Sequence, residues 1–274
     1  MMGQSAVGNA LNPVDIAVAE SLEAPSPRKE VRLVHFLAWG VHLYTALGLV
    51  LAAAIAVLLV QGGVVAFCWS FLLMVVATLI DATDGTLARK VGVKKVLPKF
   101  DGRKLDDITD FLTYTFLPLL LIWRAELLPP GTEGWLVLPL LASAYGFCQV
   151  DAKTDDGFFL GFPSLWNVVA LYLYVLYLPG WLSLGIVIVL GLMTFVPSLY
   201  LYPTQPGSLN MLSNILGAVW TVLLLAIFWR LPIDHVPRAD DPSRSLGLIS
   251  LFYPAFYMIT SWSITIRRWC GGHA

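Results

Sequence analysis

Charged residues and cysteines are both scarce in this chain. Only 13% of its 274 residues are Asp, Glu, Lys or Arg, whereas 58% are hydrophobic, and the mean hydropathy is +0.75. This balance excludes an ordinary soluble domain and predicts a polytopic membrane protein. The three cysteines are odd in number and scattered, which argues against a disulfide framework. Their spacing is not that of metal ligands. We expect no nucleic-acid partner.

Long hydrophobic runs recur through most of the chain. Because a membrane-spanning helix needs about 20 predominantly apolar residues, we expect an all-α bundle of about eight such helices. Their predicted ranges are 40–60, 64–84, 105–124, 135–151, 158–178, 181–200, 209–229 and 246–266.

The N-terminal part has a different composition. Residues 1–27 are rich in Ala, Ser, Pro and Glu, and we expect a disordered tail, because no basic segment precedes an apolar core as in a signal peptide. Residues 28–39 combine bases at one end with apolar residues at helical spacing. We interpret them as an amphipathic interfacial helix, with an extension of the first span as the alternative. Residues 28–274 would form one membrane-embedded domain.

The distribution of bases predicts the orientation. If both termini are cytoplasmic, the outer side keeps only Arg124, Arg230, Arg238 and Arg244 of the seventeen Lys and Arg residues. This asymmetry is what the positive-inside rule expects.

Four aspartates flank the loop between the second and third predicted spans. Asp81 and Asp84 are three residues apart, and Asp106 and Asp110 are four apart, so each pair stacks on one helix face if its flank is helical. Two antiparallel helices would bring four carboxylates into one space, where they would repel one another. Divalent cations such as Mg²⁺ or Mn²⁺ relieve such repulsion. A plain charged loop that caps two helices is the simpler alternative.

The same stretch resembles the signature of the CDP-alcohol phosphotransferase family, D-x-x-D-G-x-x-A-R followed by G-x-x-x-D-x-x-x-D. The matching residues are Asp81, Asp84, Gly85, Ala88, Arg89, Gly102, Asp106 and Asp110. Twelve residues separate Arg89 from Gly102, a longer spacer than is usual in the family. That spacer and the segment L-P-K-F-D-G-R-K-L-D-D resemble the bacterial phosphatidylcholine synthase branch.

The resemblance implies a catalytic domain that transfers a phosphatidyl group from CDP-diacylglycerol to choline and releases CMP. It implies two Mn²⁺ or Mg²⁺ ions, a site that opens to the cytoplasm from the bacterial inner membrane, and a possible homodimer. Asp81, Asp84 and Asp106 would be metal ligands, and Asp110 would bind metal and act as the catalytic base. The residues implied to contact CDP-diacylglycerol are Gly85, Ala88, Arg89, Gly102 and Thr45.

The acceptor is predicted from charge. After Lys104, the only base on the predicted cytoplasmic side before the C-terminal tail is Lys153, which disfavours an acceptor that carries phosphate. Carboxylates and aromatic rings suit a quaternary ammonium group. The candidate choline-binding residues are Tyr114, Asp107, Asp151 and Trp166. Transfer to another alcohol such as serine, a cation-binding transporter and a membrane protein without chemistry remain alternatives.

Overall fold

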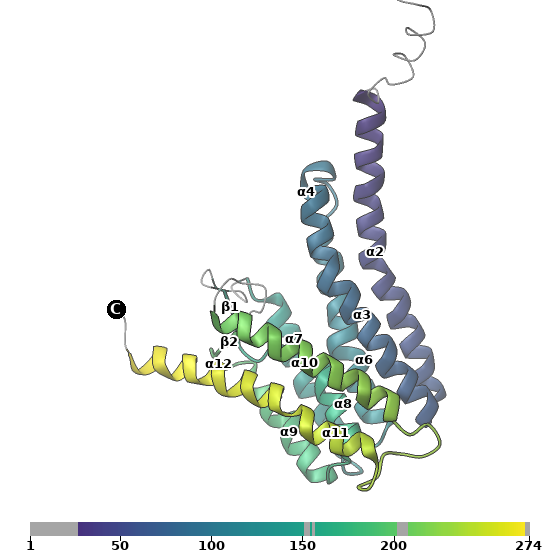
Figure 1. Ribbon diagram of the computed structural model, residues 1–274, viewed down its shortest axis with the longest axis vertical. Helices are drawn as coiled ribbons and strands as arrows, with labels where there is room; N and C mark the ends of the chain where they lie inside the picture. Colours follow the sequence, from purple (N-terminus) through teal and green to yellow (C-terminus); the bar gives the residue numbers. More distant parts are fainter. Residues whose placement is uncertain (1–26, 151–153, 155–156, 202–207, 272–274) are drawn as a thin grey trace, which may run out of the picture.

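The first two helices form a long antiparallel pair. The structure, a computed structural model, describes residues 27–150, 154, 157–201 and 208–271. Helices α2 (Pro27–Gln61) and α3 (Val64–Val91) lie side by side and extend beyond the rest of the molecule (Figure 1). Gly62 and Gly63, with φ angles of 71° and 88°, form the sharp turn between them, a conformation that glycine adopts without steric cost.

The predicted interfacial helix over residues 28–39 is corrected by the structure. It is continuous with the first span, because no proline or strong helix breaker interrupts the chain between Pro27 and Gln61. Residues 28–39 are therefore the extension that was the alternative interpretation. The predicted disordered tail lies, apart from Pro27, outside the described residues.

A short helix links α3 to the next membrane segment. Gly92, with φ 70°, ends α3 in the left-handed conformation that favours glycine at helix C-termini. Helix α4 (Val93–Val96) then folds back on α2, where Val93 packs with Ala38 and Val41. Its two lysines, Lys94 and Lys95, are exposed.

The third segment is one helical run with a wider turn in its middle. It comprises α5 (Gly102–Asp110), the π-helix η1 (Phe111–Phe116) and α6 (Leu117–Arg124). The Asp101 side chain caps α5 by accepting hydrogen bonds from the backbone N–H groups of Arg103 and Lys104. Pro118 has no N–H to donate to the Tyr114 carbonyl, and its ring would clash with that carbonyl in a regular α-helix. The π turn widens the backbone at this place.

Two of the predicted spans are shorter than expected because a strand of a two-stranded antiparallel sheet replaces part of each. After η2 (Glu133–Leu136) and α7 (Val137–Cys148), strand β1 (Phe158–Leu160) precedes α8 (Trp166–Leu176), and β2 (Leu199–Leu201) follows α9 (Gly180–Met193). The strands pair antiparallel, with Phe159 opposite Tyr200. Pro163 and Pro197, which disfavour a helical residue before them, stand between strand and helix in each case.

The last helix of the chain supplies hydrogen-bond acceptors for strand β2. Helices α10 (Ser208–Arg230), α11 (Pro242–Ser250) and α12 (Phe252–Cys270) follow, so the predicted helix 246–266 falls on two helices. The Thr265 and Ser261 hydroxyls accept hydrogen bonds from the backbone N–H groups of Leu199 and Leu201, at 2.8 and 3.3 Å. These bonds satisfy an edge strand that would otherwise leave polar groups buried without partners.

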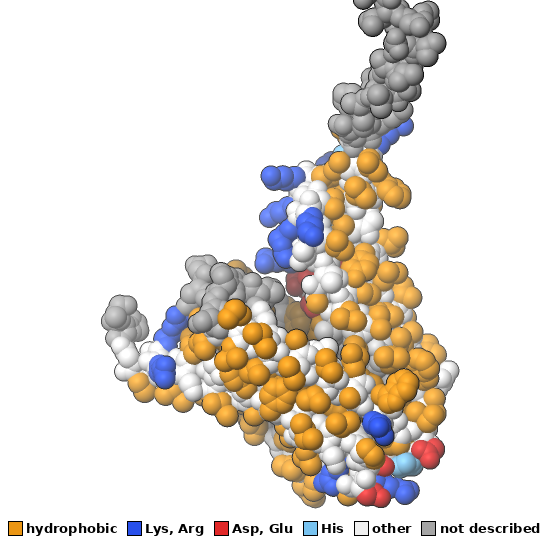
Figure 2. Space-filling view, viewed as in Figure 1, with side chains coloured by type: hydrophobic (Ala, Val, Ile, Leu, Met, Phe, Trp, Pro, Cys, Tyr) orange, Lys and Arg blue, Asp and Glu red, His pale blue; other side chains and the backbone are white. Residues whose placement is uncertain are grey.

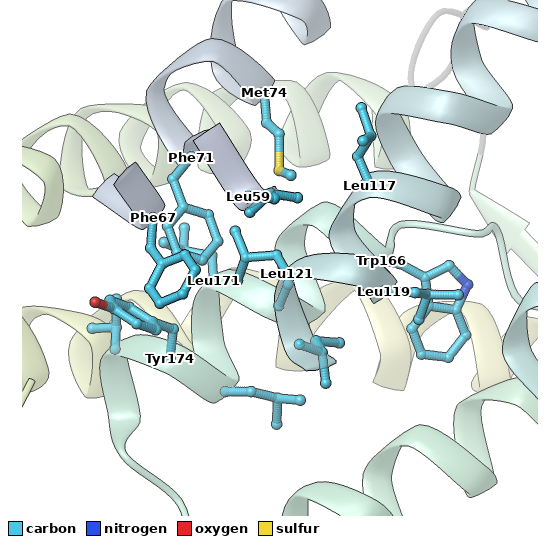
Figure 3. Packing of buried hydrophobic residues seen from close by; sticks show 14 of the residues in the cluster. Leu59, Phe67, Phe71, Met74, Leu117, Leu119, Leu121, Trp166, Leu171 and Tyr174 are labelled. Atoms are coloured by element: carbon cyan, nitrogen blue, oxygen red, sulfur yellow. The ribbon is translucent and has the colours of Figure 1, made fainter. Parts of the chain in front are cut away.

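The main hydrophobic core lies where α2, α3, α6 and α8 meet. Figure 3 shows Leu59, Phe71, Leu121 and Tyr174 converging from these four helices, and all four are almost fully buried. This core fixes the position of α3 relative to α6, and thereby the ends of both segments that carry the aspartates.

The hydropathy of the helices confirms a multi-pass membrane protein. Among the described residues, four helical stretches are long and apolar enough to cross a membrane: Val31–Gln61, Val64–Val91, Leu209–Arg230 and Pro242–Cys270. Three shorter apolar helices accompany them: Glu133–Cys148, Trp166–Leu176 and Gly180–Met193. Charged side chains gather near α4, near the end of α12 and at the loop before α11, while hydrophobic side chains cover most of the surface between them (Figure 2).

The loop before α11 contains a histidine held by two carboxylates. His235 Nδ1 lies 2.8 Å from Asp234 Oδ1, and its Nε2 lies 3.2 Å from Asp241 Oδ1. Hydrogen bonds that the ring donates to the Asp241 and Asp234 carboxylates raise the pKa of His235 above its ordinary value of 6.5. The protonated ring is therefore favoured by folding, and its contribution to stability is complete below about pH 6.5 and lost as pH rises through the higher folded-state pKa.

We predict that His235→Gln lowers the melting temperature of the purified protein at pH 6 and changes it little at pH 9. Melting curves in detergent across this range check the prediction. His35→Gln is the matched control, because His35 Nδ1 bonds the Val31 carbonyl of its own helix rather than a carboxylate. An equal loss at both pH values for His235→Gln would show that the charge of the ring is irrelevant.

Candidate active site

Three aspartates from two helices lie close together. Asp81 and Asp84 on α3 and Asp106 on α5 each offer a carboxylate oxygen, and these oxygens lie within 4.8 Å of one another. Asp84 is 5% exposed, and the other two are partly buried. Three hard oxygen ligands at this spacing fit a divalent cation such as Mg²⁺ or Mn²⁺.

Asp110, the fourth aspartate, faces the same pocket from the end of α5. The pocket contains about 210 Å³ of empty space, part of which is open to the outside. Figure 2 shows carboxylate side chains in a hollow beside the basic residues near α4. The lining residues are Thr45, Gly48, Ala77, Ile80, Asp81, Asp84, Asp106, Thr109, Asp110 and Thr113. All four aspartates predicted from their spacing are therefore brought together.

Two hydroxyl groups hold the carboxylates of α3 in place. Thr45 on α2 donates a hydrogen bond of 2.7 Å to Asp84 Oδ2. Tyr114, in the π-helix, donates a bond of 2.7 Å to Asp81 Oδ2. Each bond fixes one oxygen of a carboxylate and orients the group as a whole. Such outer contacts commonly determine how well a carboxylate binds metal.

Close contacts between backbones bring the helices to this spacing. A Cβ atom on Gly48 of α2 would collide with Thr109 Cγ2 of α5. A Cβ atom on Gly102 would lie 2.6 Å from Cε1 of His42, also on α2. Both glycines therefore allow α5 to approach α2, and with it the aspartates of α5 approach those of α3.

Comparison with known proteins identifies the family. The sequence profile of the CDP-alcohol phosphatidyltransferase family matches residues 42–197, more than half of the chain. The chain belongs to the CDP-alcohol phosphatidyltransferase family. It is therefore a transferase, and the matched range includes all four aspartates.

Several curated relatives share most of their length with this chain. A phosphatidylcholine synthase of Pseudomonas aeruginosa is 40% identical over 198 residues, which is 72% of this chain and 82% of that protein. Another of Legionella bozemanae is 38% identical over 201 residues, or 70% of this chain and 93% of that protein. A third, of Legionella pneumophila, is 33% identical over 251 residues, or 85% of this chain and 94% of that protein.

The other residues of the family motif lie around the cluster. Gly85, Ala88 and Arg89 follow Asp84 along α3, and the exposed Arg89 guanidinium folds back over Gly85 and bonds the Thr86 hydroxyl at 3.0 Å. Ala88 packs toward α2. Gly102 does not line the pocket, because its open side is filled by the His42 ring.

The three described candidates for choline binding, Tyr114, Asp107 and Trp166, do not line the pocket. Trp166 is fully buried in the core, where its indole N–H donates to the Ser143 hydroxyl at 2.9 Å, and it has no open ring face for a ligand. Tyr114 is directed at Asp81 and is not a lining residue. Asp107 is half-buried on α5 outside the lining. Asp151 lies outside the described residues.

Sequence analysis missed five lining residues that the same spacing rule could have found. Ala77 and Ile80 precede Asp81 and Asp84 by four residues. Thr109 and Thr113 follow Asp106 and Asp110 by three residues, and Gly48 follows Thr45 by three. Positions three or four apart share a helix face. The π-helix at Phe111–Phe116 was also not predicted. Pro118, which disturbs a regular α-helix, was the feature of the sequence that could have indicated it.

We predict that Tyr114→Phe weakens Mn²⁺ binding on the order of tenfold, because Asp81 loses the bond that orients it. Titration of the purified protein with Mn²⁺, with free ion followed by electron paramagnetic resonance, measures the affinity. Tyr44→Phe is the matched control, since it also removes one phenolic bond, to Thr83 Oγ1 at 2.8 Å. Unchanged Mn²⁺ affinity with a raised choline KM would instead assign Tyr114 to the acceptor.

We also predict that Gly102→Ala destabilises the protein by about 1–3 kcal/mol, the usual cost of forced overpacking. The comparison is Gly40→Ala, which meets no atom within 4 Å and should be neutral or stabilising in its helix. Thermal unfolding measures both. If the His42 ring is the cause, Gly102→Ala should cost much less in a His42→Ala background; an equal cost there would exclude it.

Proposed function

We propose that this protein is a phosphatidylcholine synthase that transfers the phosphatidyl group of CDP-diacylglycerol to choline and releases CMP. The observation that carries the proposal is the convergence of Asp81, Asp84, Asp106 and Asp110 in one pocket. It occurs in a chain whose curated relatives are named phosphatidylcholine synthases.

The acidic residues would hold two divalent cations, Mn²⁺ or Mg²⁺. Asp81, Asp84 and Asp106 have the donor atoms and spacing for a shared site, and Asp110 would complete it. When bound, such ions neutralise the pyrophosphate and stabilise its entering and leaving oxygens. Thr45 and Tyr114 would not bind the metal themselves but would orient the carboxylates of Asp84 and Asp81 by hydrogen bonds.

The reaction joins the choline oxygen to the phosphorus of the phosphatidyl group and breaks the bond to CMP. Asp110 would accept the hydroxyl proton of choline as the oxygen attacks. A carboxylate is a weak base for an alcohol, so this proton transfer must accompany bond formation. Gly85, Ala88 and Arg89 would contact the CDP group, with Arg89 as the cation nearest in sequence to the first aspartate pair.

The charge of the pocket favours choline over a phosphate-bearing alcohol. Its described lining includes four aspartates and no lysine or arginine. Once the two cations hold the pyrophosphate, this lining offers no protein cation to bind a second phosphate on the acceptor, and a quaternary ammonium needs none. Serine is the closest competing acceptor, because it is also small and carries an ammonium group.

We further propose that the enzyme lies in the bacterial inner membrane with both termini and the pocket on the cytoplasmic side. The bases near α4 stand at the same end as the aspartates, as the positive-inside rule expects for a cytoplasmic end. A single catalytic domain over 28–274 and a homodimer remain predictions.

An assay of the purified protein with CDP-diacylglycerol and Mn²⁺ tests the proposal. CMP release and the product lipid are measured with choline, serine, glycerol phosphate and inositol in turn. We predict that choline is the preferred acceptor and that Asp110→Asn lowers CMP release about 100-fold or more.

Asp101→Asn serves as the matched control for the charge change, because asparagine also caps a helix N-terminus. It should retain activity. Preference for another acceptor would overturn the choline assignment, and full activity of Asp110→Asn would exclude Asp110 as the base. Full activity in excess EDTA would exclude the metal centre.

A further inference from the structure

Six exposed bases gather at the end of the molecule that carries the pocket. We call residues 90–104, from the end of α3 through α4 to the start of α5, the basic head. Asp101, the cap of α5, is its only acidic residue. Within the described residues, no salt bridge or hydrogen bond of the six side chains is found. The bases are Lys90, Lys94, Lys95, Lys99, Arg103 and Lys104.

The basic head has a defined shape. Val93 is 5% exposed and anchors α4 on Ala38 and Val41 of α2, which turns Lys94 and Lys95 outward. The charges therefore stand on a docked element rather than on a loose loop.

Large apolar side chains surround the basic head. Trp39 and Phe100 make an edge contact with ring centroids 5.3 Å apart, and they are 51% and 38% exposed. Phe36 and Leu43 on the same end of α2 are 74% and 67% exposed. Exposed aromatic and aliphatic groups beside lysines are typical of segments that lie in the headgroup layer of a membrane.

The length of the helices places the basic head at that depth. Helix α2 has 35 residues, about 50 Å at 1.5 Å per residue, whereas the hydrocarbon core is about 30 Å thick. The other end of the bundle is marked by Arg124, which bonds the Leu59 carbonyl at 2.9 Å. Counting about 20 residues back from Leu59 along α2 reaches Trp39, which places Trp39 and the basic head at the edge of the hydrocarbon.

From this arrangement we propose that the basic head is a docking surface for anionic phospholipids of the surrounding bilayer. Its bases would bind lipid phosphates, while Trp39 and Phe100 insert at the level of the headgroups. This inference uses the charge and exposure of the head alone and would stand if the acceptor proposed above were wrong.

Fluorescence quenching in vesicles tests the proposal on the full chain without substrate. The probes are brominated phosphatidylglycerol and brominated phosphatidylcholine at equal mole fraction. Because the chain has ten tryptophans, the Trp39 signal is taken as the difference between the wild type and Trp39→Phe. We expect phosphatidylglycerol to quench Trp39 several-fold more strongly than phosphatidylcholine.

Two variants of equal charge loss locate the effect. Lys94→Gln with Lys95→Gln should abolish the preference for phosphatidylglycerol, since each lysine near an anionic surface contributes severalfold to binding. Arg230→Gln with Arg238→Gln, at the opposite end, should leave it unchanged. Melting temperatures confirm that both double variants fold. Equal quenching by the two lipids in the wild type, or an unchanged preference in the lysine variant, would overturn the proposal.

A competition arm separates bilayer lipid from substrate, because CDP-diacylglycerol also carries phosphate. Unbrominated CDP-diacylglycerol is added to the same vesicles at a small fraction of the phosphatidylglycerol. The preference should persist. If this small fraction removes it, the basic head is part of the substrate site and the proposal is wrong. The binding readout needs no turnover, so loss of CMP release in the assay above would not affect it.

Discussion

Repulsion among four carboxylates at a membrane boundary is the constraint on which this structure depends. Asp81, Asp84, Asp106 and Asp110 share one pocket, and an uncompensated cluster of this kind is costly in a membrane protein. Close helix packing at Gly48 and Gly102 holds the carboxylates near one another in spite of this repulsion. Hydroxyl groups stabilise two of them by donating hydrogen bonds to Asp84 and Asp81. The carboxylates are therefore preorganised as ligands for a cation.

The rest of the bundle keeps polar backbone groups away from lipid while it supports this pocket. Hydrophobic packing of Phe71, Leu121 and Tyr174 fixes α3 against α6 and α8. A two-stranded sheet interrupts the helices, and Ser261 and Thr265 of α12 accept hydrogen bonds from the outer edge of β2. Side chains of the protein thus supply the partners that this backbone would lack in lipid.

Sequence reasoning reached the features that follow from helical spacing. It located the aspartate pairs, since i, i+3 and i, i+4 positions share a face, and it found helices at each of the predicted ranges. It failed where tertiary contacts decide. The strands of the two-stranded sheet replaced parts of two apolar runs, and the buried Trp166 indole donates its N–H to Ser143. The hydrogen bond from Tyr114, on the π turn, to Asp81 is a tertiary contact that helical spacing does not predict.

The long spacer between Arg89 and Gly102 connects the pocket to the basic head. It forms α4 and the turn through Phe100, and this turn brings Phe100 to 4.3 Å from the His42 ring. Gly102 then packs under the same ring and begins α5, on which Asp106 and Asp110 lie. His42 is also one turn from Thr45, which holds Asp84. The basic head and the carboxylate pocket therefore contact the same stretch of α2, from His42 to Thr45.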